Sequence, residues 1–289
     1  ATRNGSVNTS SAKARAKPPA NAAQTKTAPL STPKVEHITV SRHLPPTANG
    51  VTNLTPGGGL MPPQTAPRSQ SGLTRDFIAK QAPTANIAAL VADLPGVNFS
   101  SQDPFGLTGN NMTMRGMTQA QIGYLFEGAP MADPINYQPY SSMMVDSENL
   151  GSVTVSQGSP DLDAPLYNAV GGQITATEIN PSHKQRGFVD LAGGTHSGNK
   201  EFIRYETGDI GNTGIRGFVS FSHTSYNNWR GPGGLFRYDV DSKFVKEWGD
   251  GNSISAVFSF NRQQQTSWRS PTLSQWNKYG DSFNYAGSF

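Results

Sequence analysis

The most constraining feature of this chain is the regular alternation of apolar and polar residues in its last hundred positions. In the segment LFRYDVDSKF, at 235–244, one face carries Phe236, Tyr238 and Val240, while the other face is charged. The segments 214–223 and 253–262 alternate in the same way, with Phe218 and Val257 as exceptions. Because side chains of a strand point alternately to two sides, we predict antiparallel strands with one apolar and one polar face.

Two architectures use such strands, an outer-membrane β-barrel and a soluble β-sandwich with one wet face. Residues 187–289 hold 19 of the 27 aromatic residues and all four Trp. The links expected at 210–213 and 247–252 are short, and those at 225–234 and 264–282 are long and rich in Trp, Tyr, Asn and Arg. Short turns at one end, long loops at the other and aromatic girdles are typical of barrels. Sandwich strands also alternate, so the pattern favours the barrel and leaves the sandwich open.

The N-terminal segment, residues 1–68, has a composition that cannot build a core. It holds ten of the 21 Pro, eight Lys or Arg against one acid, and no aromatic residue. We therefore predict a flexible tether. Nucleic-acid binding is disfavoured as its role, because basic residues are not interleaved with aromatic ones. One island breaks the pattern and could pair as a strand with the sheet edge of a partner; it consists of Val35, Glu36, His37, Ile38, Thr39 and Val40.

Residues 69–186 read as a small mixed α/β domain. The spacing of Ile87, Leu90, Val91 and Leu94 predicts one apolar stripe on a helix at 86–94, which Pro95-Gly96 ends. A helical turn is expected within 73–81, capped by Thr74 or Ser71. Strands are expected at 97–100, at 112–116 and 122–128, at 152–156 and at 172–179.

Three motifs in this region resemble those of a known family. They are TRDFIAKQAPTANIAALVADLPGVNF at 74–99, MTMRG followed by IGYLFEGAP at 112–130, and NAVGGQITATEI at 168–179. In this order they resemble the plug domain of TonB-dependent outer-membrane receptors. Glu127 stands where the family usually has Asp, and Gly151 and Thr154 stand where it usually has Glu. The resemblance implies a tether at 1–68, a mixed α/β plug at 69–186 and, at 187–289, the first antiparallel strands of a transmembrane β-barrel.

The resemblance also implies a function. The chain is expected to transport a scarce ligand, most often an iron–siderophore, across the outer membrane of a Gram-negative bacterium. Its partners would be outer-membrane lipid, the chelate or other small-molecule substrate, and TonB, which would pair with the strand Val35–Val40. No enzyme activity and no cofactor are implied. A ligand-sensing receptor and a soluble plug-like binding module are the alternatives.

Candidate site residues fall into two groups. Loops 101–111 and 131–141 combine aromatic, amide and acidic side chains that suit a ligand, and the resemblance places plug loops near the ligand; the residues are Asp103, Phe105, Asn110, Asn136, Tyr137 and Tyr140. Arg115 and Glu127 each end a strand-like run and precede a glycine. We expect them to be structural charges between plug and barrel. A catalytic pair and plain solvated charges are the other interpretations.

Several other kinds of site find no support. The chain has no cysteine, which excludes disulfides and thiol catalysis. The five histidines lack metal-site spacing, so no metal site is predicted. A plugged barrel needs about 22 strands, and residues 187–289 suffice for roughly five or six at about ten residues each plus connections. We therefore expect this chain to be part of a longer protein.

Overall fold

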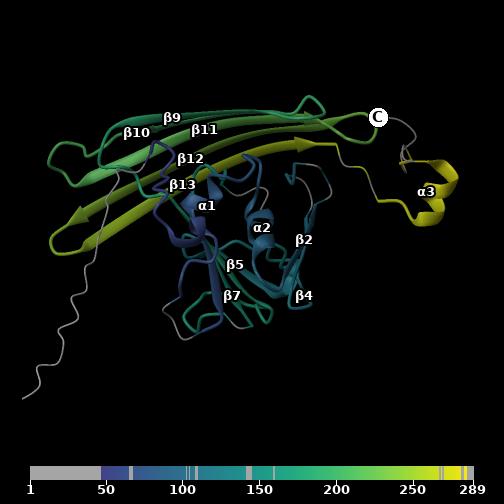
Figure 1. Ribbon diagram of the computed structural model, residues 1–289, viewed down its shortest axis with the longest axis horizontal. Coiled ribbons are helices and arrows are strands. Elements are labelled where there is room, and N and C mark those ends of the chain that lie inside the picture. Colours follow the sequence, from purple (N-terminus) through teal and green to yellow (C-terminus); the bar gives the residue numbers. More distant parts are fainter. Residues whose placement is uncertain are drawn as a thin grey trace, which may run out of the picture. The chain divides into compact units, whose positions relative to one another are not determined.

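The computed structural model describes residues 47–64, 68–101, 103, 105–107, 110–140, 145–158, 160–266, 268, 270–280 and 283–284. The chain divides into two units, Ala1–His43 and Leu44–Phe289, and every described residue belongs to the second. The predicted strand Val35–Val40 lies outside the described residues. Within the second unit we distinguish a first module, residues 47–182, from a wall of five long strands (Figure 1). The first module includes residues 47–64 and 68, which the sequence analysis assigned to the tether, because Val51 is buried and Thr52 and Thr55 bond to Asp76.

Short helices of the first module lie where the apolar stripe predicts. Asn86 caps α2 (Ile87–Leu90) by accepting a hydrogen bond from the Ala89 amide at 3.0 Å, and the 3₁₀ turn η2 (Val91–Asp93) continues it. Gly96, at φ 75°, then turns the chain into β2. The helical turn expected within 73–81 is α1 (Arg75–Ile78), with Thr74 as N-cap residue but no side-chain cap bond. Two further 3₁₀ turns are η1 (Pro56–Gly59) and η3 (Gln119–Gln121).

Strands of the first module form two sheets, of order β1-β7-β8-β5-β6 and β2-β3-β4. All pairs are antiparallel except β5 and β8, which are parallel. The bounds are β1 Gln70–Thr74, β2 Val97–Ser101, β3 Asn110–Met114, β4 Met117–Thr118, β5 Ile122–Phe126, β6 Ala129–Pro130, β7 Leu150–Gln157 and β8 Gly172–Glu178. The predicted strands are confirmed, and β1 is one that the sequence analysis missed.

The core of the first module is aliphatic. The predicted stripe of α2 and η2 is buried against β7 and β8, where Val153, Val155 and Ile174 are fully buried. Burial of such side chains contributes about 1.5–3 kcal/mol each. The first module is therefore held together mainly by apolar packing.

The wall is an antiparallel meander in which each strand pairs with its neighbours in sequence, in the order β13-β12-β11-β10-β9. Within the described residues the sheet ends at β9 and β13 and does not close. The strands are β9 Arg186–Gly193, β10 Asn199–Glu206, β11 Ile215–Asn227, β12 Gly234–Trp248 and β13 Asn252–Gln265. A short helix, α3 (Leu273–Tyr279), follows β13 within the link that we predicted as a long loop.

One expected loop is shorter than predicted. The link 225–234 shrinks to residues 228–233, because β11 continues to Asn227 and β12 begins at Gly234. The reason is a small apolar cluster, in which Tyr226 and Leu235, paired in register, pack with Leu107 of the first module. This packing extends the hairpin beyond what the local sequence indicates.

The two faces of the wall have opposite character. Val219, Phe221 and Phe258 point away from the first module and are 48%, 45% and 59% exposed. On β11 and β12 the charged and hydroxyl residues of the alternate positions, such as Arg237 and Asp241, are buried. On the edge strand β13 the polar positions Ser253, Ser255 and Ser259 are exposed. The predicted alternation is thus confirmed, and on β11 and β12 the buried face is the polar one. The exception Phe218 lies on that buried face.

In the part of the chain that the structure describes, no helix is both long enough and apolar enough to cross a membrane.

Candidate functional site

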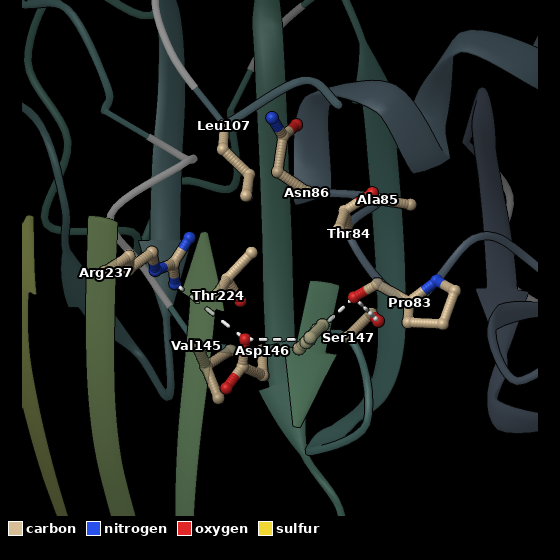
Figure 2. A pocket seen from close by; sticks show the side chains of 11 residues that line it. Pro83, Thr84, Ala85, Asn86, Leu107, Val145, Asp146, Ser147, Thr224 and Arg237 are labelled. Atoms are coloured by element: carbon tan, nitrogen blue, oxygen red, sulfur yellow. Dashed lines mark hydrogen bonds and ion pairs between the residues drawn. The ribbon is translucent and has the colours of Figure 1, made fainter. Parts of the chain in front are cut away.

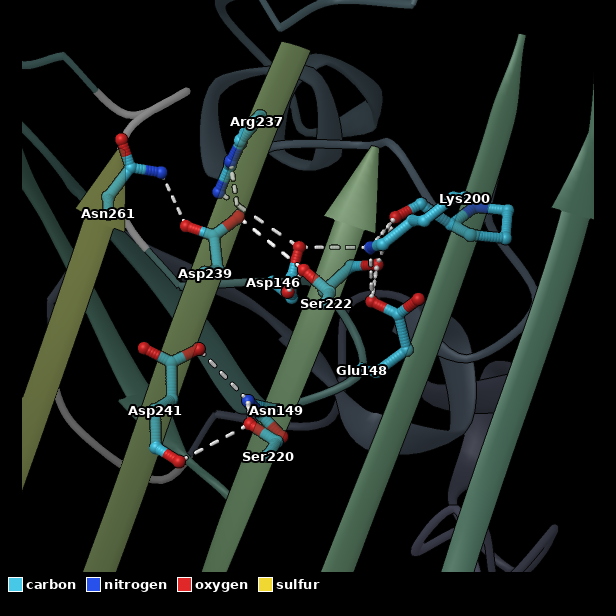
Figure 3. A network of polar contacts seen from close by, with 12 residues as sticks. Asp146, Glu148, Asn149, Lys200, Ser220, Ser222, Arg237, Asp239, Asp241 and Asn261 are labelled. Carbon is cyan, nitrogen blue, oxygen red and sulfur yellow. Dashed lines mark hydrogen bonds and ion pairs between the residues drawn. The ribbon is translucent and has the colours of Figure 1, made fainter. Parts of the chain in front are cut away.

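The largest concentration of buried charge lies between the loop 146–149, just before β7, and the inner face of the wall (Figure 3). Lys200 of β10 is its centre. Its Nζ lies 3.0 Å from an Asp146 carboxylate oxygen and 2.8 Å from one of Glu148, and it donates to the Pro83 carbonyl oxygen at 2.7 Å. One wall lysine therefore joins two acids and a backbone carbonyl of the first module.

Further wall residues complete this network. Ser222 donates to Asp146 at 2.5 Å, and the Arg237 guanidinium lies 4.0 Å from the same carboxylate. Arg237 is also bonded to Asp239, whose other oxygen accepts from Asn261. Each carboxylate is therefore met by at least one donor from another strand or loop, as buried charges require.

Asn149 forms a second bridge between the module and the wall. Its amide nitrogen donates to the Ser220 hydroxyl at 2.7 Å and to the Asp241 carboxylate at 3.1 Å. Its amide oxygen accepts from Arg204 at 3.2 Å, and Arg204 also donates to the Glu148 carbonyl oxygen at 2.7 Å. The loop 146–149 is thus bonded to three neighbouring wall strands, β10, β11 and β12.

The two acids beside Lys200 differ in their tendency to ionise. Burial raises the pKa of Glu148 above its usual value, and the neighbouring Asp146 adds to the rise, against the opposing effect of Lys200. Burial also opposes ionisation of Asp146, but Lys200 and Arg237 outweigh it and lower the pKa of that carboxyl. Asp146 is therefore the more acidic member of the pair.

Comparison with known proteins identifies a large part of the first module. Residues 62–172 match the family model described as TonB-dependent Receptor Plug Domain. The chain carries a TonB-dependent receptor plug domain. From here on the first module is called the plug.

Three solved structures of outer-membrane or import receptors are similar in fold to this chain. The pyoverdine outer-membrane receptor FpvA of Pseudomonas aeruginosa PAO1, bound to pyoverdine, is 16% identical with a TM-score of 0.60, covering 71% of this chain and 31% of that one. The ferric-catecholate import receptor Fiu of E. coli K12 is 16% identical with a TM-score of 0.56, covering 70% of this chain and 28% of that one. The P. aeruginosa ferric enterobactin receptor PfeA, as the R480A mutant in complex with enterobactin, is 15% identical with a TM-score of 0.53, covering 70% of this chain and 34% of that one.

These likenesses show the fold, and this chain spans about a third or less of the length of those receptors. No curated protein matches its sequence. The resemblance read from the sequence and the fold class of plug plus antiparallel barrel strands are confirmed.

The plug places Arg115 and Glu127 in equivalent turns. Each is the first residue of a two-residue hairpin loop, Arg115-Gly116 between β3 and β4 and Glu127-Gly128 between β5 and β6. Both residues have φ 49° and both glycines have φ 81°, as the tight turn that suits twisted hairpins demands. The conformation of these hairpin turns therefore explains why a glycine follows each charged residue, an explanation that the sequence analysis did not consider.

Their side chains have separate partners. Glu127 pairs with Lys243 of β12 at 2.8 Å and accepts from the Glu178 amide at 2.6 Å, so it contacts the wall. Arg115 bonds to Gln157 and Ser69 at 3.2 and 3.3 Å, both within the plug. The structure does not bring the two together, and their role as structural charges stays a prediction.

The predicted ligand residues lie in two separate loops. Asp103 accepts from the Phe105 amide at 2.8 Å, which folds that loop locally, whereas Asn136 donates to the Tyr140 hydroxyl at 3.0 Å. The Tyr137 ring meets that of Tyr167 edge-on at 5.4 Å. Asn110 begins β3, and nothing is described of its side chain. Whether these six residues bind a ligand stays a prediction.

Phe105 has a packing role that the sequence did not indicate. Its ring lies 4.6 Å from that of Tyr226 in β11. A Cβ at Gly194 or Gly198, in the β9–β10 turn, would approach the same ring to 2.9 or 2.6 Å. The ring therefore seats a plug loop against the wall. It also borders a cavity of about 270 Å³ lined on its other sides by Thr84, Lys200 and Tyr226, among others.

A small pocket adjoins the charged network, and its lining comes from both plug and wall (Figure 2). Figure 2 shows Asp146 facing Arg237 there, with the backbone of Pro83–Asn86 on the other side. Among the described residues no group of three or more His, Cys, Asp or Glu could hold a metal ion. Since residues of both plug and wall line it, the pocket is part of the plug–wall interface.

At the end of the wall away from the turn 249–251, an arginine lies among indole rings. The guanidinium carbon of Arg230 lies 5.7, 5.5 and 5.8 Å from the ring centres of Trp229, Trp268 and Trp276. These contacts join the β11–β12 loop to α3. The aromatic load of the long links was visible in the sequence, but its convergence on one arginine was not.

Proposed function

We propose that this chain supplies the plug and first barrel strands of a TonB-dependent transporter that carries an iron chelate across the outer membrane. The single observation that carries this proposal is the reversed polarity of the wall. Apolar side chains such as Val219 and Phe221 are exposed, and the charged face holds the plug. A wall in lipid requires such an arrangement, because its lumen side is polar and its outer side is apolar.

The substrate class is inferred from similar structures. The receptors for pyoverdine, enterobactin and ferric catecholate share this fold. The substrate would bind above the plug, near the loops that carry Phe105 and Tyr140, and no bond of it would be broken. The strand Val35–Val40 would pair with the sheet edge of TonB and transmit the force that moves the plug.

Uptake of radioactive iron tests the proposal. The full-length protein is produced in cells that lack their other chelate receptors, and ferric catecholate and ferric pyoverdine are supplied separately. Saturable binding and uptake of at least one of them are expected. Binding of neither would overturn the substrate class.

Two deletions of equal length test the TonB strand. Removing residues 35–40 should abolish uptake and leave binding of the chelate unchanged, because the strand contacts TonB and not the substrate. Removing residues 8–13, from the same tether, should leave both intact. Unimpaired uptake without residues 35–40 would show that TonB does not act through this strand.

A further inference from the structure

We propose that three arginines clasp the backbone at Thr47–Asn49, where the tether meets the plug, and that opening of this clasp is the first step when the tether is pulled. Three successive carbonyl oxygens each accept from a different arginine. Arg186 donates to that of Thr47 at 3.0 Å, Arg204 to that of Ala48 at 3.0 Å, and Arg75 to that of Asn49 at 2.7 Å.

The three arginines come from three elements on both sides of the interface. Arg186 belongs to β9 and Arg204 to β10 of the wall, and Arg75 opens α1 of the plug. Glu206 balances the two wall arginines, at 2.9 Å from Arg186 and 3.2 Å from Arg204. The clasp therefore ties one short stretch of backbone to plug and wall at once.

Two of these arginines also hold the loop before β7. Arg204 donates to the carbonyl oxygen of Glu148 at 2.7 Å, and Arg75 donates to that of Leu150 at 3.2 Å and to that of Ser147. The loop 146–149 carries the plug–wall network around Lys200. Displacement of the clasped backbone would remove acceptors from the side chains that steady this loop. The clasp thus links the tether to the contact that keeps the plug against the wall.

A second anchor follows the clasp along the chain. The Asp76 carboxylate accepts from the amide and hydroxyl of Thr52, at 2.7 and 2.9 Å, and from those of Thr55, at 3.1 and 2.7 Å. Force that enters through the tether reaches Thr47–Asn49 before it reaches this anchor. The clasp is therefore the element that must open first.

Residues 1–289 contain no cysteine. With any cysteine elsewhere in the intact protein replaced by serine, an introduced thiol is the single reactive site. Val51 is 8% exposed and closes a turn in which its amide bonds to the Thr47 hydroxyl at 3.2 Å. A V51C thiol is therefore protected while the clasp is closed and reacts when it opens locally. The measurement is the rate of reaction with N-ethylmaleimide in the intact, detergent-solubilised protein.

R186Q is the test variant and R216Q the matched control. Arg216 of β11 also holds a carbonyl, that of Pro181 at 2.9 Å, and also pairs with a glutamate, Glu247 at 2.6 Å, but it does not contact Thr47–Asn49. Loss of one charge-assisted bond should raise the V51C rate about tenfold in R186Q. R216Q should leave it within about twofold. Equal rates in R186Q and the parent would overturn the clasp.

A second reporter separates local opening from loss of the plug fold. Val155 is fully buried in the plug core, and its V155C thiol should stay protected in R186Q. If both thiols become reactive together, Arg186 supports the whole plug and the local clasp is wrong. The role of the clasp in transport rests on the proposed function, whereas the existence of the clasp does not. A failed uptake experiment would leave the thiol result valid, and a failed thiol experiment would leave the uptake result valid.

Discussion

The plug core and the plug–wall interface are both buried, but they are built from opposite kinds of side chain. In the core, β7 and β8 present Val153, Val155 and Ile174 to the helices. At the interface, Lys200 and Asp146 are as inaccessible as many core residues, yet both are charged groups.

This difference shows why the plug core and the plug–wall interface differ in how easily they separate. Separating an apolar core exposes hydrocarbon to water, which costs roughly 25 cal/mol per Å². Separating a polar interface returns charges to water, and the regained hydration offsets much of the lost pairing. The plug is therefore suited to stay folded as a unit while its interface with the wall opens.

The sharpest way to break this comparison is to leave the interface charges unpaired. K200M removes the cation that faces both Asp146 and Glu148 and should destabilise the folded plug by about 3–5 kcal/mol, because a buried charge then lacks its partner. The measurement is the denaturant dependence of V155C thiol exposure. K246M, at an exposed wall position, is the control and should change it by about 0.5 kcal/mol or less. An unchanged midpoint in K200M would mean that the network contributes nothing.

A core cavity tests the other half of the comparison. I174A should cost about 2–5 kcal/mol in the same titration, because Ile174 is fully buried and its removal leaves a void. I203A changes an isoleucine of the wall that is 53% exposed, and it should cost about 0.5 kcal/mol or less. Equal effects of the two substitutions would show that the plug is not held by its apolar core.

The smallest expected effect concerns a single carboxyl at the border of the two regions. Burial raises the pKa of Glu178 to about 9, and Asp241 adds to the rise against the opposing effect of Lys243. The folded state then keeps a proton that the unfolded state releases, so the contribution of Glu178 to stability falls as pH rises from about 4.5 towards 9.

E178Q should flatten this dependence. At pH 8 its thermal midpoint should exceed that of the parent by about 2–4 °C, as roughly 1 kcal/mol gives in a domain of this size. At pH 5 the two midpoints should nearly coincide. D163N, at an exposed acid, is the control. A parent midpoint that does not fall between pH 5 and pH 8 would contradict the expectation.

Local periodicity was enough to predict much of the fold. The stripe Ile87–Leu94 and the alternation of β11, β12 and β13 depend on residues close in sequence, and the structure has them as predicted. Strand β1 was missed, since QSGLT pairs with residues 152–156 and carries little pattern of its own. Whether a segment such as QSGLT forms a strand depends on a pairing partner that is distant in sequence.

The interface could be predicted only in part. The sequence showed the polar faces of the wall strands. It also showed that Arg115 and Glu127 are unusual charges at the ends of strand-like runs. The pairing of Lys200 with Asp146 was not visible, because it depends on how the plug lies on the wall. The turn chemistry of Arg115-Gly116 and Glu127-Gly128 was within reach, since a residue followed by glycine between two strands is a hairpin signal.

The pairing order of the strands has a consequence for the time course of folding. Every wall strand pairs with a neighbour in sequence, so each hairpin closes a short loop. The plug sheet instead joins Gln70 to Ser156 and, in parallel, Ile122 to Gly172. Long loops are slower to close than short ones. We therefore expect the wall hairpins to form sooner than the plug sheet, although the plug residues come first in the chain.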